Sequence, residues 1–327
     1  MRPLSTRLLC WIALFSFSPR APAQITVRQC GSSPRYRALD SSILARLQAV
    51  DQSAEHVFGL LPQSGMPVYQ VLNIPVVVHV LYYPKTETSA ETGKIDDAQI
   101  NSQIDALTRD YNPPDSDRQT TIVPLRFRDR FASAKLTFTL AKREWIETKT
   151  AVFTDGDNAK RKPSGIEPED VDHKLNIWVV PKLTDSNGNA LLGYSSWPGE
   201  PTSKDGVVIY YEAFGTIGTA KVPFDKGHTV THEVGHWLNL HHLWGDLSDN
   251  PQCAQDDGVD DTPKQDGPTL NCPKPDDRPK ACDNNRDGRM FPNYMDYTLD
   301  ACMSMFTAEQ VVKMRTTIES LRPKLGH

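Results

Sequence analysis

The sequence lacks a second long hydrophobic run, N-glycosylation sequons and an excess of basic residues. After an apolar stretch at residues 8–17, no segment approaches the roughly 20 apolar residues that a membrane helix needs, so we expect no membrane span. The 327-residue chain has 36 Lys and Arg against 41 Asp and Glu, a formal net charge of -5. This negative balance argues against a nucleic-acid partner. Without a sequon, glycosylation gives no evidence of localisation.

The N-terminus has the three parts of a secretory signal peptide. Arg2 and Arg7 supply positive charge, residues 8–17 are apolar, and Ala21-Pro22-Ala23 forms an A-x-A cleavage site. We therefore predict a signal peptide over residues 1–23 and a secreted, extracellular protein that begins near Gln24.

Cysteine is scarce, with six in the chain, but its placement is informative. Cys10 lies within the expected signal peptide, and Cys30 stands alone. The other four crowd into a polar, Asp- and Pro-rich stretch: Cys253, Cys272, Cys282 and Cys302. In an oxidising compartment this is a disulfide pattern. Four cysteines permit three pairings, and their spacing does not choose among them.

Residues 24–70 have the texture of an appendage, because a short helix over 41–57 is the one element we predict there. From Ile74 to Tyr82 the residues are β-branched and aromatic, as in a buried strand, so we place a folded domain over 71–327. Strands mixed with helices indicate an α+β fold with a mixed, α/β-like sheet. The further predicted elements are a helix over 96–111, strands over 136–140, 175–180, 191–197 and 207–211, and a helix over 307–321.

Histidines gather in the segment Thr231-His232-Glu233-Val234-Gly235-His236. On a helix, His232 and His236 lie one turn apart on the same face, about 6 Å along the axis, so both imidazoles can bind one zinc ion. Glu233 lies beside them and is not needed as a ligand, so its carboxylate can act as general base on zinc-bound water. A structural zinc site would not need this residue and would be closed by a fourth protein ligand.

A catalytic zinc site needs a third protein ligand and one open position. His242 supplies that ligand if the chain turns back after the helix, and His241 is the competing residue. Such a turn usually uses Gly, and Asn239 is of the next most tolerant type for positive φ. We predict His242 because it keeps a ten-residue offset from His232.

The run from His232 to His242 resembles the extended zinc signature of metzincin peptidases, and its Val-Gly-His-Trp-Leu is most similar to the pappalysin family. The resemblance extends over about residues 74–321. It implies a zincin-like metzincin fold in which upper and lower subdomains flank the active-site helix, and a zinc-dependent metalloendopeptidase. Family members carry a Met-turn, which Asn293-Tyr294-Met295-Asp296-Tyr297 matches. By this resemblance Met295 forms the floor beneath the zinc and Tyr297 stabilises the oxyanion.

The same resemblance bears on the polar stretch. Related proteases bind structural calcium in the loop that matches residues 256–263, so Asp257 and Thr262 are candidate calcium ligands, and a solvated acidic loop is the alternative. The resemblance also implies two disulfides, Cys253–Cys282 and Cys272–Cys302.

Cys30 resembles the cysteine switch of metzincin zymogens, in which a pro-segment thiolate takes the open zinc position. An unpaired or intermolecular cysteine is the alternative.

Residues 191–195 are expected to form an edge strand, to which a substrate can add as an extra strand. Some relatives favour a basic residue after the scissile bond through an acid in the specificity pocket. In this sequence Ala301 directly precedes Cys302, and the acid, Asp300, lies one position earlier than that. We therefore assign no cleavage-site preference.

Together these features predict a secreted zinc metalloendopeptidase, with residues 24–70 as pro-segment and 71–327 as catalytic domain. We expect a monomer that hydrolyses internal peptide bonds of extracellular proteins or peptides. A zinc-binding pseudo-protease and a hydrolase of non-peptide amides are the alternatives.

Overall fold

The structure is a computed structural model that describes residues 25, 27–60, 68–87, 90–119, 123–248 and 253–327. The expected signal peptide lies outside these residues. Among the helices of the described ranges, none has the length and apolar character required to cross a membrane.

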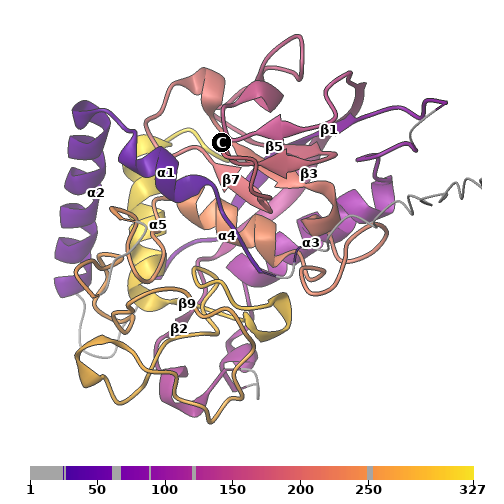
Figure 1. The fold of residues 1–327 in the computed structure, drawn as a ribbon. Helices are drawn as coiled ribbons and strands as arrows, with labels where there is room; N and C mark the ends of the chain where they lie inside the picture. The colour runs from indigo at the N-terminus through magenta and orange to yellow at the C-terminus, as the bar shows by residue number, and fades with distance from the viewer. Residues whose placement is uncertain (1–24, 26, 61–67, 88–89, 120–122, 249–252) are drawn as a thin grey trace, which may run out of the picture.

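A five-stranded sheet forms the upper part of the molecule (Figure 1). Its order is β3-β1-β5-β8-β7, and the first four strands run parallel while β7 is antiparallel to β8. The central strand β5 is buried along its whole length, as expected of an apolar run covered on both faces. This mixed sheet confirms the predicted α+β class. The strands are β1 (Leu72–Tyr82), β3 (Leu136–Glu147), β5 (Leu175–Val180), β7 (Gly193–Ser195) and β8 (Val207–Tyr210).

Five α-helices of the described chain surround or underlie this sheet: α1 (Ser32–Arg37), α2 (Ser41–Gly59), α3 (Asp97–Tyr111), α4 (His228–Trp237) and α5 (Ala308–Leu321). Helix α3 begins where predicted, because the Asp96 carboxylate accepts a hydrogen bond from the Gln99 N–H at 2.8 Å. Helix α5 begins with a capping box between Thr307 and Gln310. In Figure 1, α2 stands beside α5, the indigo segment that leads into α1 passes by β7, and α4 lies below the sheet.

Three elements differ from the sequence-based expectations. Strand β3 continues to Glu147 rather than residue 140, because it pairs with β1 along that whole length. The expected strand over 191–197 is shorter, and β7 covers only Gly193–Ser195. Helix α1 was not predicted, since its six residues include Pro34 and make no amphipathic repeat. In each case tertiary contacts decide the length of the element.

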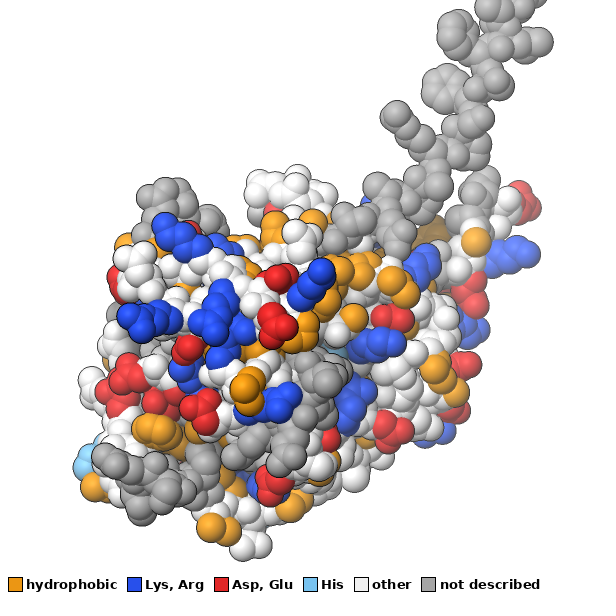
Figure 2. All heavy atoms as spheres, turned by 90° about the horizontal axis from the view of Figure 1, so that it is seen from below, with side chains coloured by type: hydrophobic (Ala, Val, Ile, Leu, Met, Phe, Trp, Pro, Cys, Tyr) orange, Lys and Arg blue, Asp and Glu red, His pale blue; other side chains and the backbone are white. Residues whose placement is uncertain are grey.

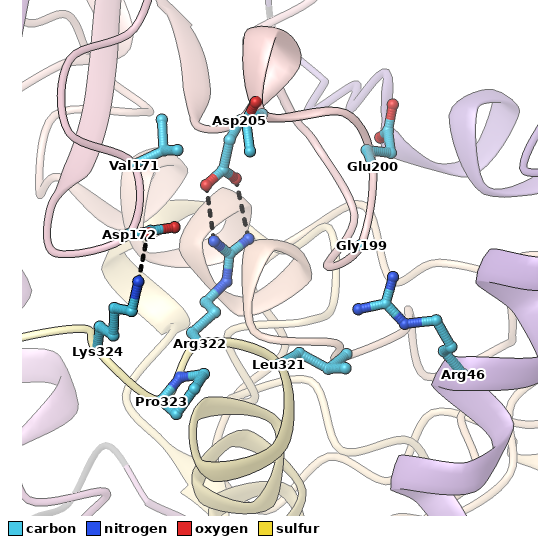
Figure 3. A pocket seen from close by; sticks show the side chains of 11 residues that line it. Arg46, Val171, Asp172, Gly199, Glu200, Asp205, Leu321, Arg322, Pro323 and Lys324 are labelled. Atoms are coloured by element: carbon cyan, nitrogen blue, oxygen red, sulfur yellow. Dashed lines mark hydrogen bonds and ion pairs between the residues drawn. The ribbon is translucent and has the colours of Figure 1, made fainter.

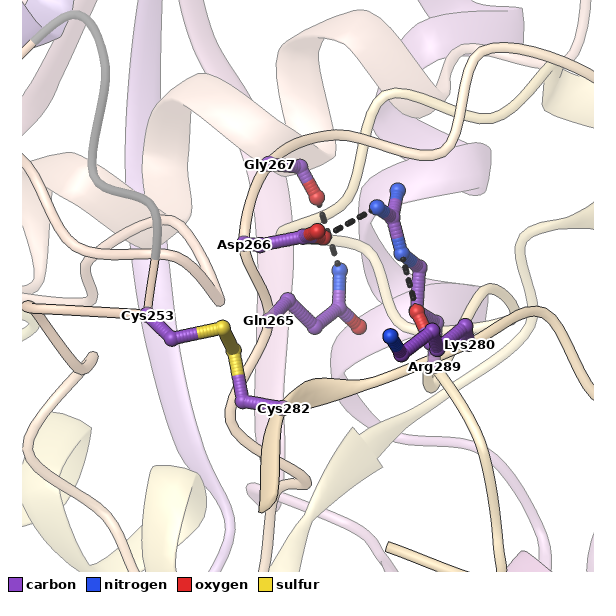
Figure 4. The surroundings of a disulfide bond; sticks show 7 residues. All are labelled: Cys253, Gln265, Asp266, Gly267, Lys280, Cys282 and Arg289. Atoms are coloured by element: carbon purple, nitrogen blue, oxygen red, sulfur yellow. Dashed lines mark hydrogen bonds and ion pairs between the residues drawn. A yellow bond between two sulfur atoms is a disulfide. The ribbon is translucent and has the colours of Figure 1, made fainter. Parts of the chain in front are cut away.

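Below α4 the chain runs mainly as loops. The described residues 253–305 contain two short 3-10 helices, Cys282–Asn284 and Asp300–Cys302, and one isolated bridge from Asn293 to Met305. Disulfides join Cys253 to Cys282 and Cys272 to Cys302, the pairs that the resemblance implies. Figure 4 shows polar contacts in the surroundings of the first disulfide: Arg289 pairs with Asp266, and its Nε donates to the Lys280 carbonyl at 2.9 Å.

Smaller elements complete the fold. Two ladders of two residues per strand join β2 (Phe131–Ala132) to β9 (Phe306–Thr307) and β4 (Phe153–Thr154) to β6 (Leu183–Thr184). Further 3-10 helices span Asp115–Gln119, Leu125–Phe127, Asn158–Lys160, Thr202–Lys204 and Tyr211–Ala213. On the face drawn in Figure 2, acidic and basic side chains are interspersed with hydrophobic ones, so opposite charges neighbour one another there.

Candidate active site

Helix α4 carries the histidine motif through the centre of the molecule. All ten of its residues are buried, which is unusual for a segment that contains three histidines and a glutamate. The one-turn spacing places the rings of His232 and His236 on the same face, with their centroids 4.8 Å apart. Burial of these polar groups requires partners, and the surrounding elements supply them.

The turn after α4 forms as predicted. Asn239 has a φ of +73°, and the Leu240 N–H donates to the Gly235 carbonyl at 2.9 Å. This turn returns the chain so that His242 faces the two helix histidines. His241 instead stacks on Trp197 with ring centroids 4.9 Å apart. Of the two competing third ligands, the structure therefore brings His242 into the cluster.

The three histidines converge through their Nε2 atoms, and each pair of these atoms is 3.2 Å apart. Tetrahedral zinc with Zn–N distances near 2.0–2.1 Å separates its ligand nitrogens by about 3.3 Å, so the three donors fit zinc. Each Nδ1 is held from outside: the Tyr294 and Leu240 carbonyls are 2.7 Å from His232 and His236, and an Asp246 oxygen is 2.5 Å from His242. These contacts orient the Nε2 lone pairs inward.

Electrostatics also favour a metal at this position. Burial lowers the pKa of His236 to about 3, and burial with the neighbouring histidines lowers the pKa of His232 well below its usual value. Neutral imidazole is the form that binds zinc. The Cys30 thiol completes the group, since one donor atom from each of the four residues lies within 4.8 Å of the others. Among the described residues, these four form the group of His, Cys, Asp or Glu side chains that is arranged to hold a metal ion.

Glu233 lies at the edge of this group without joining it. Burial raises the pKa of Glu233 to about 7, while hydrogen bonds from Cys30 and Ser32 oppose the rise. The Ser32 hydroxyl is 3.0 Å and the Cys30 Sγ 3.3 Å from Oε2 of Glu233. A Cβ at Gly193 would lie 2.9 Å from the Glu233 Cγ, so glycine on β7 gives this carboxylate its space.

The predicted Met-turn lies directly under the zinc helix. Met295 is fully buried, and a Cβ added at Gly235 would lie 2.5 Å from its Sδ. Tyr297 contacts His242 edge to face, with ring centroids 4.9 Å apart. Burial raises the pKa of Tyr297 well above its usual value, so its hydroxyl stays protonated.

Two carboxylates of the site were not assigned from the sequence. Asp246 is 1% exposed and binds His242 and His241 at once. Its position four residues after His242 is a signal that could have identified it. Asp300 forms a buried ion pair with Arg28, whose Nη1 also donates to the Thr229 hydroxyl at 3.0 Å. A local sequence pattern cannot predict this ion pair, because Arg28 and Asp300 are 272 positions apart.

The two candidate calcium ligands lie together in the lower loops. The Thr262 hydroxyl is 2.9 and 2.8 Å from the two carboxylate oxygens of Asp257. Burial, followed by the nearby Asp256 charge, raises the pKa of Asp257 well above its usual range. This loop is separate from the histidine group.

Comparisons with known proteins agree with this geometry. Residues 169–319 match the model of peptidase family M43, described as pregnancy-associated plasma protein-A. A promirolysin variant from Tannerella forsythia is 35% identical, with a TM-score of 0.74, and the match covers 91% of this chain and 97% of that one. Mature mirolysin from Tannerella forsythia, solved with a cleaved peptide, is 38% identical with a TM-score of 0.67, over 79% and 99% of the two chains. An extracellular metalloprotease from Arthroderma otae is 29% identical over 84% of this chain and 87% of its own length.

Proposed function

The chain belongs to the M43 family of zinc metalloendopeptidases, with the zincin-like fold of that family, and we propose that it is secreted and cleaves internal peptide bonds of extracellular proteins or peptides. The observation that carries the proposal is the convergence of three histidine Nε2 atoms beside a carboxylate that is not one of their partners. That arrangement serves hydrolysis, whereas a purely structural site has no use for the carboxylate.

Each polar residue of the site has a separate task. His232, His236 and His242 hold the zinc, which when bound supplies Lewis-acid polarisation of a water molecule and of the scissile carbonyl. Glu233 accepts the proton of the attacking water and returns it to the leaving amine. Tyr297 donates a hydrogen bond to the oxyanion that develops on the carbonyl oxygen. Met295 packs against Gly235 on the lower side of α4 and so fixes the position of this helix.

The pro-segment indicates how a peptide lies in the cleft. The Gly31 N–H donates to the Gly193 carbonyl at 2.9 Å, and the Leu192 N–H donates to the Gln29 carbonyl at 3.0 Å. Cys30 thus forms an isolated parallel bridge with Gly193 of the edge strand β7. We infer that a peptide substrate adds to this same edge through backbone hydrogen bonds.

Residues 24–70 then act as a pro-segment that keeps residues 71–327 latent. The Cys30 thiol lies within 4.8 Å of the three histidine donors, where it would supply a fourth ligand, and it also contacts Glu233. Both catalytic functions are therefore blocked by one residue. The longer match with promirolysin than with mature mirolysin, 91% against 79% of this chain, agrees with this division.

Arg28 suggests the side chain that the specificity pocket accepts. It lies two residues before Cys30, is 1% exposed, and places its guanidinium on Asp300. The other Asp300 oxygen accepts the Lys226 N–H at 2.8 Å, which fixes the carboxylate without Arg28. Departure of the pro-segment would leave this buried acid unpaired, so a basic substrate side chain next to the scissile bond restores the pair.

Three further properties belong to the proposal. Calcium binds at Asp257 and Thr262, where a cation would offset the buried carboxylate. The signal peptide exports the protein, which is in keeping with relatives named extracellular metalloproteases. The enzyme acts as a monomer, which size-exclusion chromatography with light scattering would test.

The decisive experiment compares the mature protein with its Glu233→Ala variant on an internally quenched peptide and on casein. We expect the rate to fall by about 10²–10⁴ because the general base is lost, with zinc content unchanged. Glu319→Ala, which removes an exposed carboxylate of α5, serves as the control and should hydrolyse at the normal rate. Hydrolysis of the peptide or of casein that persists in Glu233→Ala, or after zinc is removed by a chelator, would contradict the proposal.

A further inference from the structure

Helix α1 places a second pro-segment arginine in a second acidic pocket. Arg35 Nη1 donates to an Asp157 oxygen at 3.0 Å, and Nη2 donates to a Glu200 oxygen at 2.9 Å. Nη1 also donates to the Asp155 carbonyl at 2.9 Å, and the guanidinium carbon lies 5.1 Å from the centre of the Tyr194 ring. Planar guanidinium suits such a set of in-plane acceptors and a stacked ring better than an ammonium group does.

The catalytic domain builds this pocket without help from Arg35. Asp157 uses its other oxygen, Oδ1, to pair with the buried ammonium of Lys160 at 3.4 Å. Glu200 uses Oε1 to accept the Trp197 N–H at 2.8 Å. Glu200 is therefore held by a hydrogen bond to one oxygen and presents the other to a ligand, whereas Asp157 faces Lys160 with Oδ1, without a hydrogen bond, and the ligand with Oδ2. Both side chains are less than a tenth exposed, 8% for Asp157 and 7% for Glu200.

The two acidic pockets bind pro-segment residues on either side of Cys30 in the chain. Arg28 precedes Cys30 in the chain and reaches Asp300, while Arg35 follows Cys30 and reaches Glu200. Between them, the Trp197 side chain holds the segment to the domain, because its Nε1 donates to the Ser32 carbonyl at 3.0 Å. Residues 32–37 are helical, so an extended substrate would reach the second pocket with fewer residues than separate Arg28 from Arg35.

Removal of the pro-segment changes the surroundings of Glu200. This residue also lines a cavity of about 300 Å³ on whose wall Arg46 of α2 lies, as Figure 3 shows. When α1 and α2 leave, Glu200 is exposed from both sides. Among the described residues of the domain, Lys160 and Lys204 both pair with Asp157, and the Asp155 and Glu200 carboxylates add to its charge, so the open pocket is net negative.

We propose that Asp157, Glu200 and Tyr194 form a second arginine subsite of the mature enzyme, which binds an arginine of the peptide substrate on the side of the scissile bond away from Asp300. The inference rests on the proposed protease function. Arg35 occupies the subsite in the precursor, so the pro-segment imitates a substrate at two places as well as blocking the zinc.

The test uses quenched peptides that keep one arginine for the Asp300 pocket and carry either arginine or citrulline at each successive position on the other side. Citrulline keeps the shape and removes the charge. At one position we expect kcat/KM to favour arginine by about 10-fold or more, as for hydrogen bonds between charged groups. In Glu200→Gln, where the Gln carbonyl can still accept the Trp197 N–H, this ratio should fall towards one. Asp172→Asn, an exposed control carboxylate near the same cavity, should keep the ratio.

A ratio near one at every position, or an arginine preference that survives in Glu200→Gln, would overturn the subsite. Binding separates this outcome from failure of the protease proposal. In mature Glu233→Ala, calorimetry with a peptide of residues 29–37 should show weaker binding when citrulline replaces Arg35. That difference should vanish in the Glu200→Gln background, whether or not the protein hydrolyses peptides.

Discussion

The two halves of the catalytic domain are held together by different forces. In the upper region, residues 72–240, the inner strands β5 and β8 are largely apolar, and Val76, Val77 and Val78 of β1 are fully buried. The lower region, residues 253–305, has little regular structure among its described residues and carries both disulfides. Hydrophobic burial orders the first, whereas covalent links and polar contacts order the second.

The active site joins these regions. The upper region contributes α4 with Glu233, and the lower region contributes the Tyr294 carbonyl that orients His232, together with Met295 and Tyr297. The zinc ligands thus depend on the better packed half for position and on the looped half for support. Four changes test these regions and the contacts that each one makes.

Loss of a disulfide should affect the lower region most. Replacing Cys272 and Cys302 by Ser removes a link across 30 residues, which should lower the free energy of unfolding by about 3–4 kcal/mol through the gain of unfolded-chain entropy. Urea unfolding measures the total. Hydrogen exchange should increase in residues 253–305 and remain slow in β1 and β5. Equal loss of protection in both regions would show that they unfold as one unit.

Gly235→Ala disturbs the packing of α4, in the upper region, against Met295 of the lower region. Its new Cβ would meet the Met295 Sδ at 2.5 Å, so we expect a loss of about 1–3 kcal/mol of stability and weaker zinc binding. A double-mutant cycle with Met295→Ala provides the control. If the clash is the cause, the pair should lose less than the sum of the single variants. Additive losses would mean that the helix and the Met-turn are not coupled there.

Asn239→Gly should loosen the pro-segment while sparing the turn. Glycine accepts the φ of +73°, but the hydrogen bond from the Asn239 Nδ2 to Asp51 of α2 at 2.9 Å is lost. We expect pro-segment docking to weaken by about 1 kcal/mol, seen as faster hydrogen exchange in α2. Asn239→Ala loses the same bond and adds strain at positive φ, so it should also weaken zinc binding. Equal zinc affinity of the two variants would contradict this division.

The smallest effect concerns pH and the acidic loops. Burial, followed by the nearby Asp261 charge, raises the pKa of Glu309 from 4.5 to about 7. A carboxyl with a raised pKa in the folded state binds its proton more tightly there, so its contribution to stability is full below pH 4.5 and is lost as the pH rises to about 7. Glu309→Gln should therefore be more stable than the parent at pH 8, by less than about 1 kcal/mol because the group is half exposed.

Urea unfolding at pH 5 and pH 8 in the presence of a calcium chelator measures this effect. The pH dependence of the parent should be steeper than that of Glu309→Gln. Parallel curves would show that Glu309 titrates normally. Adding calcium at pH 8 should stabilise the parent if the loop at Asp257 binds the ion, because the cation offsets the neighbouring carboxylates.

Local sequence patterns were sufficient to predict the elements whose formation depends on residues close together in the chain. The four-residue spacing of His232 and His236, the tolerance of Asn239 for positive φ and the apolar run of β1 each depend on residues close in the chain. The strand order and the length of β3 do not, because they depend on pairing between distant segments. Helix α1 escaped prediction for the same reason.

The sequence by itself determined that a zinc site exists, since helical periodicity places its first two ligands and the base, and a turn residue brings the third. Only the tertiary structure decided what faces that site. It set Cys30 against Glu233, Arg28 on Asp300 and Arg35 on Glu200, over separations of more than 160 residues. Chain connectivity fixes near neighbours through bond geometry, but contacts across such distances depend on how the whole core packs.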